Sequence, residues 1–144
     1  MYEAKGYIHY SPTRLNDKKY NHSQNWWMVL NCRNEDISNY YRHLYYLSVN
    51  KTSKILGTSY GDHLTIIRGH KEVPVNKELW KVHEGKELKF YYWNEIIRIK
   101  DFYHMKVHFP MGGSLRKELG LKPEPNFPFH LTLGMIDGSM EIED

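Results

Sequence analysis

The sequence predicts a single α+β domain in which helices lie outside a central, mostly antiparallel sheet. The chain has 144 residues, enough for one domain with its own hydrophobic core. Strand-length runs of β-forming residues alternate with segments of helical spacing, and several strands are separated only by short turn signals. The order of these elements suggests two related lobes, each contributing one helix and one strand of similar sequence.

The N-terminal part predicts two strands followed by a helix. Residues 5–10 alternate weakly between polar and apolar, and residues 26–33 form a continuous apolar run that suits a buried strand. Apolar side chains then recur at helical spacing over residues 35–49, after an N-cap sequence at residues 34–36. Much of the segment 1–25 has no clear place in this scheme.

The remainder predicts a meander between two further strand and helix units. We expect a short helix at residues 76–83, closed by Gly85, and another over residues 114–119 that is stopped by Gly120. The acidic tail, residues 137–144, is expected to be frayed. The predicted strands cover residues 63–68, 86–93, 96–100, 102–109 and 129–135.

The charge balance limits the classes of partner. A formal net charge of +3 is compatible with an anionic ligand but falls short of a stripe for binding duplex DNA. No apolar stretch approaches the length of a membrane span, and the polar N-terminus has no signal-peptide pattern. We therefore expect a cytoplasmic protein with no membrane partner.

No metal site is expected. Cys32 is the only cysteine, which excludes an internal disulfide and a cysteine-based zinc cage, and its apolar context predicts a small core residue. His104 and His108 share one face of a predicted strand, but no third ligand follows in a recognisable metal-binding pattern.

Two tetrapeptides are nearly identical, His63-Leu64-Thr65-Ile66 and His130-Leu131-Thr132-Leu133. Both fall in predicted strands, where residues i and i+2 point to the same face of the sheet. Each strand therefore presents a histidine and a threonine together and turns its aliphatic residues toward the core. If the strands are neighbours, two imidazoles and two hydroxyls surround one small space. The alternative, two amphipathic strands that share these residues by accident, is disfavoured by the repeat.

The paired His-x-Thr motifs, about 70 residues apart, resemble those of the 2H phosphoesterase superfamily. That resemblance implies a bilobal α+β domain with both motifs facing a central cleft. Residues 61–69 and 115–134 look most similar to small tailed-phage members that degrade the cyclic oligonucleotide signals of CBASS antiphage defence. The resemblance covers residues 26–135 and implies a phosphodiesterase that acts in the host cytoplasm on such a signal, as an anti-CBASS protein.

The two histidines also permit this chemistry without a metal or other cofactor. An unperturbed imidazole titrates at about pH 6.5, so one histidine can be neutral while the other is protonated. One would take a proton from an attacking 2′-hydroxyl or water, the other would protonate the leaving oxygen, and either can take either role. Thr65 and Thr132 can donate hydrogen bonds to the non-bridging phosphate oxygens.

Four further residues are candidates for substrate binding: Tyr60, Arg68, Trp93 and Lys106. Trp93 and Tyr60 suit stacking against a nucleobase, and packing inside the protein is an equal alternative for each. Arg68 and Lys106 can add positive potential for a phosphate, although a solvated surface role is the more common one for such residues.

Three functions compete. The same four motif residues would serve hydrolysis of a cyclic oligonucleotide, or processing of RNA ends through 2′,3′-cyclic phosphates or 2′–5′ linkages. From another class, a non-catalytic sponge would hold a cyclic nucleotide without turning it over, but pure binding does not need two proton-transfer groups. The sequence selects neither the nucleotide nor the oligomeric state.

Overall fold

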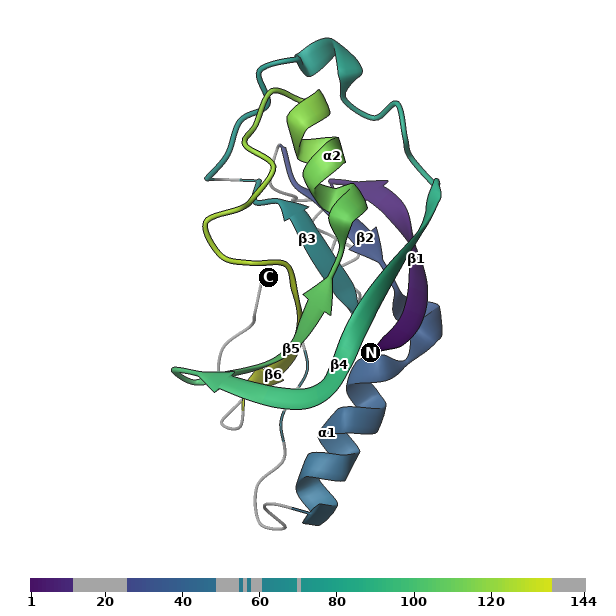
Figure 1. The fold of residues 1–144 in the computed structure, drawn as a ribbon, viewed down its shortest axis with the longest axis vertical. Coiled ribbons are helices and arrows are strands. Elements are labelled where there is room, and N and C mark those ends of the chain that lie inside the picture. Colours follow the sequence, from purple (N-terminus) through teal and green to yellow (C-terminus); the bar gives the residue numbers. More distant parts are fainter. Residues whose placement is uncertain (12–25, 49–54, 56, 58–60, 70, 136–144) are drawn as a thin grey trace, which may run out of the picture.

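The computed structural model describes residues 1–11, 26–48, 55, 57, 61–69 and 71–135. Figure 1 shows a curved sheet at the centre of the molecule, with one helix in its upper half and one in its lower half. Tyr60, the segment 12–25 and the tail 137–144 lie outside the described residues, so the predictions made for them stay predictions.

Within the described residues, six strands close into a barrel in which every neighbouring pair is antiparallel. Their order around the barrel is β1-β2-β3-β6-β5-β4. The α+β class and the antiparallel sheet are therefore confirmed, and closure removes the exposed edges of an open sheet. The strands are β1 (Tyr2–Tyr10), β2 (Met28–Asn31), β3 (His63–Ile67), β4 (Glu87–Ile99), β5 (Phe102–His108) and β6 (His130–Met135).

The main core fills the barrel. Alternate residues of the strands point inward, and the innermost side chains have no exposed surface. Gly6 on β1 allows the barrel wall to close tightly, because a Cβ there would lie 2.6 Å from the carbonyl oxygen of Asn31. The fully buried strand residues are Met28, Leu30, Leu64, Ile67, Phe90, Met105, Leu131 and Leu133.

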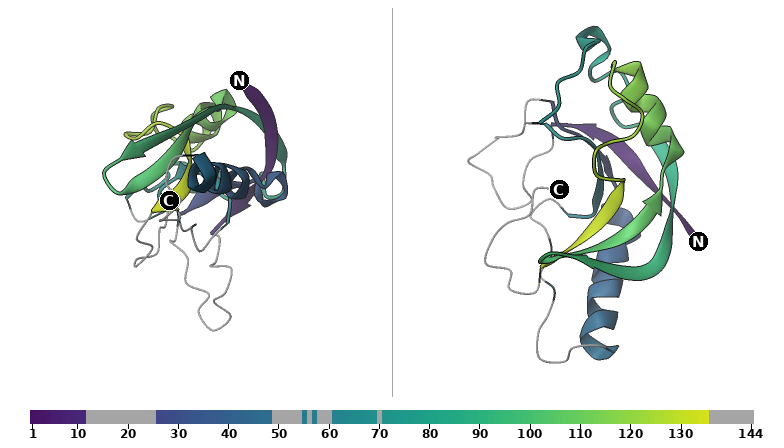
Figure 2. Two further views of the ribbon diagram at one scale, coloured as in Figure 1. Left: turned by 90° about the horizontal axis from the view of Figure 1, so that it is seen from below. Right: turned by 60° about the vertical axis from the view of Figure 1, so that its left-hand side comes forward.

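The helices α1 (Ile37–Ser48) and α2 (Pro110–Glu118) pack on this barrel. Seen from below in Figure 2, α1 lies between β1 and the hairpin of β4 and β5, and its residues Ile37 and Tyr41 join the barrel core. The predicted end of α2 is confirmed: Gly120 has φ +87°, and a Cβ there would lie 2.6 Å from Val75.

The predicted N-terminus of the first helix was wrong. A short 3-10 turn covers Arg33–Glu35, Asp36 takes a left-handed conformation with φ 52°, and α1 begins only at Ile37. The cap comes from Asp62, which is distant in sequence: its Oδ2 accepts the backbone N–H of Ser38 at 2.9 Å, and its Oδ1 accepts the Ser38 hydroxyl. A carboxylate can satisfy a helix terminus from another segment when the fold brings it there.

Two other predicted elements differ from the structure. The proposed helix at residues 76–83 is a single 3-10 turn, Lys77–Leu79, followed by turns up to Gly85. The two strands predicted at residues 86–93 and 96–100 are one long strand, β4. Its register against β5 shifts between Tyr92 and Ile96, but the strand continues through the shift. Such a β-bulge absorbs extra residues that a sequence pattern presents as a turn.

Candidate functional site

The barrel places the two His-x-Thr motifs on adjacent strands. β3 begins at His63 and β6 at His130, and the two strands pair antiparallel with Leu64 opposite Leu131. Both leucines point into the core, so the histidines and threonines of both motifs share the outer face of the barrel. Continuing the antiparallel register by one residue in each direction sets His63 opposite Thr132 and Thr65 opposite His130. Each histidine thus neighbours the threonine of the other motif.

The flanking strands β2 and β5 extend this arrangement, so that two rows of side chains run across four strands. One row adds Asn31 of β2 beside His63 and His104 of β5 beside Thr132. The other row adds Val29 beside Thr65 and Lys106 beside His130. Register shifts flank both motifs, between Met28 and Val29 and between Tyr103 and His104, and β-bulges at such positions re-aim side chains next to active sites.

The two motif histidines are held in the same way. His63 Nδ1 lies 2.8 Å from the carbonyl oxygen of Gly61, and His130 Nδ1 lies 2.8 Å from that of Pro128. A carbonyl only accepts, so in each ring Nδ1 carries the proton and donates it. The neutral form of each imidazole therefore presents an unprotonated Nε2, the nitrogen that can accept a proton.

His63 is buried, with 4 % of its surface exposed. Trp27 contacts the imidazole edge-on, with ring centroids 5.8 Å apart. Trp27 and Val29 form a small hydrophobic cluster separate from the barrel core. The backbone is fixed one residue earlier, where Asp62 caps α1 and its carbonyl oxygen accepts the Cys32 N–H at 2.9 Å. Of the two adjacent tryptophans Trp26 and Trp27, Trp27 is therefore the buried one, and its contact with His63 could not be predicted from the sequence.

His130 is only partly buried and lies among aromatic rings. Phe127 and His104 both contact it edge-on, at centroid distances of 4.7 and 4.6 Å. His104 also reaches the second threonine, since its Nδ1 lies 3.4 Å from Thr132 Oγ1. His104 is thus a third imidazole beside the motifs, although its sequence spacing from His108 suggested only a metal ligand. Its even spacing from Lys106 on one strand face was the available signal.

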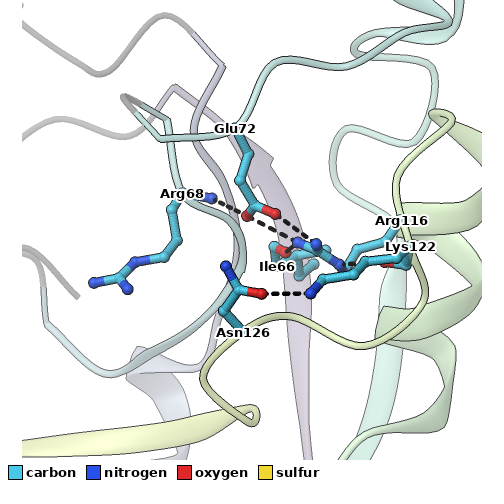
Figure 3. Close-up of polar contacts among 6 residues, drawn as sticks. All are labelled: Ile66, Arg68, Glu72, Arg116, Lys122 and Asn126. Atoms are coloured by element: carbon cyan, nitrogen blue, oxygen red, sulfur yellow. Dashed lines mark hydrogen bonds and ion pairs between the residues drawn. The ribbon is translucent and has the colours of Figure 1, made fainter.

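The substrate-binding candidates are placed unequally. Lys106 is the direct cross-strand neighbour of His130, and its Nζ lies 5.0 Å from the centre of the Trp93 ring. The chain therefore brings Trp93 and Lys106 together beside the second motif. Arg68 follows the end of β3, and Figure 3 shows its guanidinium pointing away from the carboxylate of Glu72.

A buried arginine ties the surroundings of both motif strands together. Arg116 of α2 has no exposed side-chain surface and donates to the carbonyl oxygens of Ile66 in β3, at 2.8 Å, and Lys122, at 2.9 Å. It also forms a two-pronged pair with Glu72, at 2.9 and 2.5 Å, as Figure 3 shows. One side chain thus joins β3 to the proline-rich segment that leads into His130.

The described residues contain no group of three or more His, Cys, Asp or Glu side chains arranged to hold a metal ion. Within the same residues, no helix has the length and apolar character needed to cross a membrane. A comparison with known family models, curated proteins and solved structures finds no match to this chain.

Proposed function

We propose that the protein is a phosphodiesterase that cleaves a cyclic oligonucleotide by histidine acid–base catalysis, without a metal. The observation that carries this proposal is the pairing of Leu64 with Leu131, which sets both His-x-Thr motifs on one face of adjacent strands. The two-lobed 2H architecture and the role against CBASS defence belong to the same proposal and rest on the resemblance of the motifs.

The histidines supply the two proton transfers. With Nδ1 engaged by a backbone carbonyl, one neutral imidazole takes the proton of a ribose 2′-hydroxyl or a water through Nε2. The oxygen attacks phosphorus, and the bond from phosphorus to the leaving oxygen breaks. The other imidazole, protonated, gives its Nε2 proton to that oxygen. A 2′-hydroxyl nucleophile would leave a 2′,3′-cyclic phosphate, which water can open with the two roles exchanged.

The threonines and the cation support the phosphate. Among the described residues, the buried Thr65 Oγ1 has no hydrogen-bond partner, so its hydroxyl is available to a non-bridging oxygen. Lys106 beside His130 adds a positive charge where phosphate charge builds up. Trp93 under the Lys106 ammonium provides a flat face on which a base can stack.

The proposal is tested with the purified protein in EDTA. Cyclic di- and trinucleotides and an RNA ending in a 2′,3′-cyclic phosphate are incubated separately, and the products are resolved by mass, with His63→Ala as control. Linearised cyclic oligonucleotide that is absent with His63→Ala supports the proposal. Conversion of the RNA end alone would contradict the proposal and indicate an RNA-end-processing enzyme. Tight binding of a cyclic nucleotide without turnover would contradict it and indicate a non-catalytic sponge.

A further inference from the structure

The two motif threonines differ in their neighbours. Thr65 pairs across the strands with Val29, an apolar residue, whereas Thr132 pairs with His104. Thr65 Oγ1 has no hydrogen-bond partner in the described part of the chain, whereas Thr132 Oγ1 lies 3.4 Å from His104 Nδ1. The barrel therefore breaks the symmetry of the repeated motif and adds an ionisable side chain to the second copy only.

His104 is buried and packed against aromatic rings. It is 8 % exposed, and its ring stacks near Phe102 at 6.2 Å and tilts against Phe127 at 5.7 Å. His130 meets the same ring edge-on at 4.6 Å. The imidazole thus contacts two phenylalanines and both polar residues of the second motif.

The direction of the His104–Thr132 contact decides what the threonine can do. A threonine hydroxyl has one proton to donate and two lone pairs that accept. If His104 Nδ1 were unprotonated, Thr132 would donate to it and would have no proton left for a phosphate oxygen. If Nδ1 carries the proton, Thr132 accepts from His104 and its own O–H stays available.

We propose that His104 is a positioning residue: it donates its Nδ1–H to Thr132 Oγ1 and so directs the Thr132 hydroxyl proton toward the phosphate. This inference deepens the proposed function and rests on it for its catalytic consequence. The hydrogen bond itself is a property of the protein without substrate. It makes the second motif a three-residue unit of His104, His130 and Thr132, whereas the first motif acts through two residues.

The first test reads the hydrogen bond directly. Long-range ¹H–¹⁵N spectra of the wild-type protein assign the protonated ring nitrogen of each histidine, with His104→Asn and Thr132→Val used for assignment. We expect His104 Nδ1 to be protonated, and we expect its ¹⁵N chemical shift to change in Thr132→Val. An unprotonated Nδ1 in His104 would overturn the inference, whether or not the protein turns over a nucleotide.

The second test reads the consequence for turnover. His104→Phe keeps a ring beside Phe102 and Phe127 but removes the donor, and should lower kcat about three- to tenfold with little change in KM. His104→Asn places an amide N–H near the former Nδ1 and should recover most of the loss. In a Thr132→Val background His104→Phe should have no further effect, whereas in Thr65→Val its effect should persist in full.

These outcomes separate the two proposals. Wild-type turnover with an equal loss from His104→Phe in both threonine backgrounds would overturn the positioning role and leave the proposed function intact. Absence of turnover by the wild-type protein on every cyclic and RNA substrate would overturn the proposed function, and the nitrogen spectra would still decide the hydrogen bond.

Discussion

His63 and His130 are anchored by identical hydrogen bonds, each from Nδ1 to the carbonyl oxygen two residues earlier in the chain, at 2.8 Å in both cases. A repeated sequence has therefore become a repeated geometry. Because the strands run antiparallel with Leu64 opposite Leu131, the two imidazoles lie on one face, each beside the threonine of the other motif. This arrangement suits a reaction in which one ring removes a proton on one side of a phosphate and the other ring supplies one on the opposite side.

Trp93 and Lys106 form a stacking platform beside the second motif, and their loss should weaken substrate binding more than it slows the chemical step. Trp93→Ala removes the ring that lies 5.0 Å from Lys106 Nζ, and loss of one stacked base costs about 1–3 kcal/mol, or roughly 5- to 150-fold in KM. Steady-state kinetics should show a much smaller change in kcat. Lys106→Ala should raise KM as well, most strongly at low salt.

Lys89→Ala is the matched control for Lys106→Ala. Lys89 lies on β4 but is exposed, and its ion pair is with Glu3 on β1, away from the motifs. Its kinetics should equal those of the wild type. An unchanged KM in both Trp93→Ala and Lys106→Ala would show that these two residues do not bind the substrate.

Asp62 should contribute both to the stability of α1 and to the position of His63, because its carboxylate caps the helix and it directly precedes the histidine. Asp62→Asn weakens the bonds to Ser38, and loss of a helix cap typically costs about 1 kcal/mol in the free energy of unfolding. Because His63 follows directly, its displacement should lower kcat by up to about 10²-fold. Urea denaturation and kinetics measure the two effects.

Asp36→Asn provides the comparison, since Asp36 is exposed and its left-handed φ of 52° suits asparagine equally well. That variant should match the wild type in both stability and kcat. If Asp62→Asn also kept wild-type kcat while losing stability, the cap would hold the helix without positioning the histidine.

The Glu72–Arg116 pair should make stability depend on acid. Burial raises the pKa of Glu72, but hydrogen bonds from Arg116 and the Arg68 N–H, with the charges of both guanidinium groups, outweigh it and hold the pKa below its ordinary value. A depressed pKa in the folded state means that stabilisation is full above the unfolded value, about 4.3, and is lost as pH falls through the folded value.

Glu72→Gln should therefore cost about 3 kcal/mol near neutral pH, because Arg116 is left buried without its counter-charge. The difference from the wild type should shrink as pH falls below about 4. Denaturation curves at several pH values measure it, with the exposed Glu78→Gln as control. A difference that stays constant down to pH 2 would contradict the assigned ion pair.

Cys32 should be unreactive in the folded protein. Burial raises the pKa of its thiol well above the ordinary value, and the charges of Asp62 and Glu35 act in the same direction. Only the thiolate reacts with alkylating reagents. Iodoacetamide at pH 8 should leave the native protein unmodified and label it completely in urea, and rapid labelling of the native protein would show that the β2 end is open.

The parts of the site that depend on one strand could be predicted from sequence. The two-residue period of a strand is enough to put His63 with Thr65, and His130 with Thr132, on one face. Proline and glycine marked the limits of α2, because their backbone preferences are local. These predictions needed no knowledge of which strands are neighbours.

Features that depend on strand neighbours could not be predicted. The contacts of His104 with Thr132 and of Trp27 with His63 follow from closure of the barrel and from two register shifts, which join segments far apart in the chain. The cap on α1 likewise comes from Asp62, so the local polar residues 34–36 led to a wrong prediction of the helix start. In each case a tertiary contact replaced a local preference.

The most direct test of the account measures turnover by His63→Ala, His130→Ala and the double variant in EDTA, with the wild-type rate on the same cyclic oligonucleotide as reference. Each single variant should lose about 10²–10⁴-fold in kcat while circular dichroism shows an intact fold. The double variant should be no slower than the slower single variant, because the two rings act as one acid–base unit. A folded single variant that keeps the wild-type rate would contradict the account.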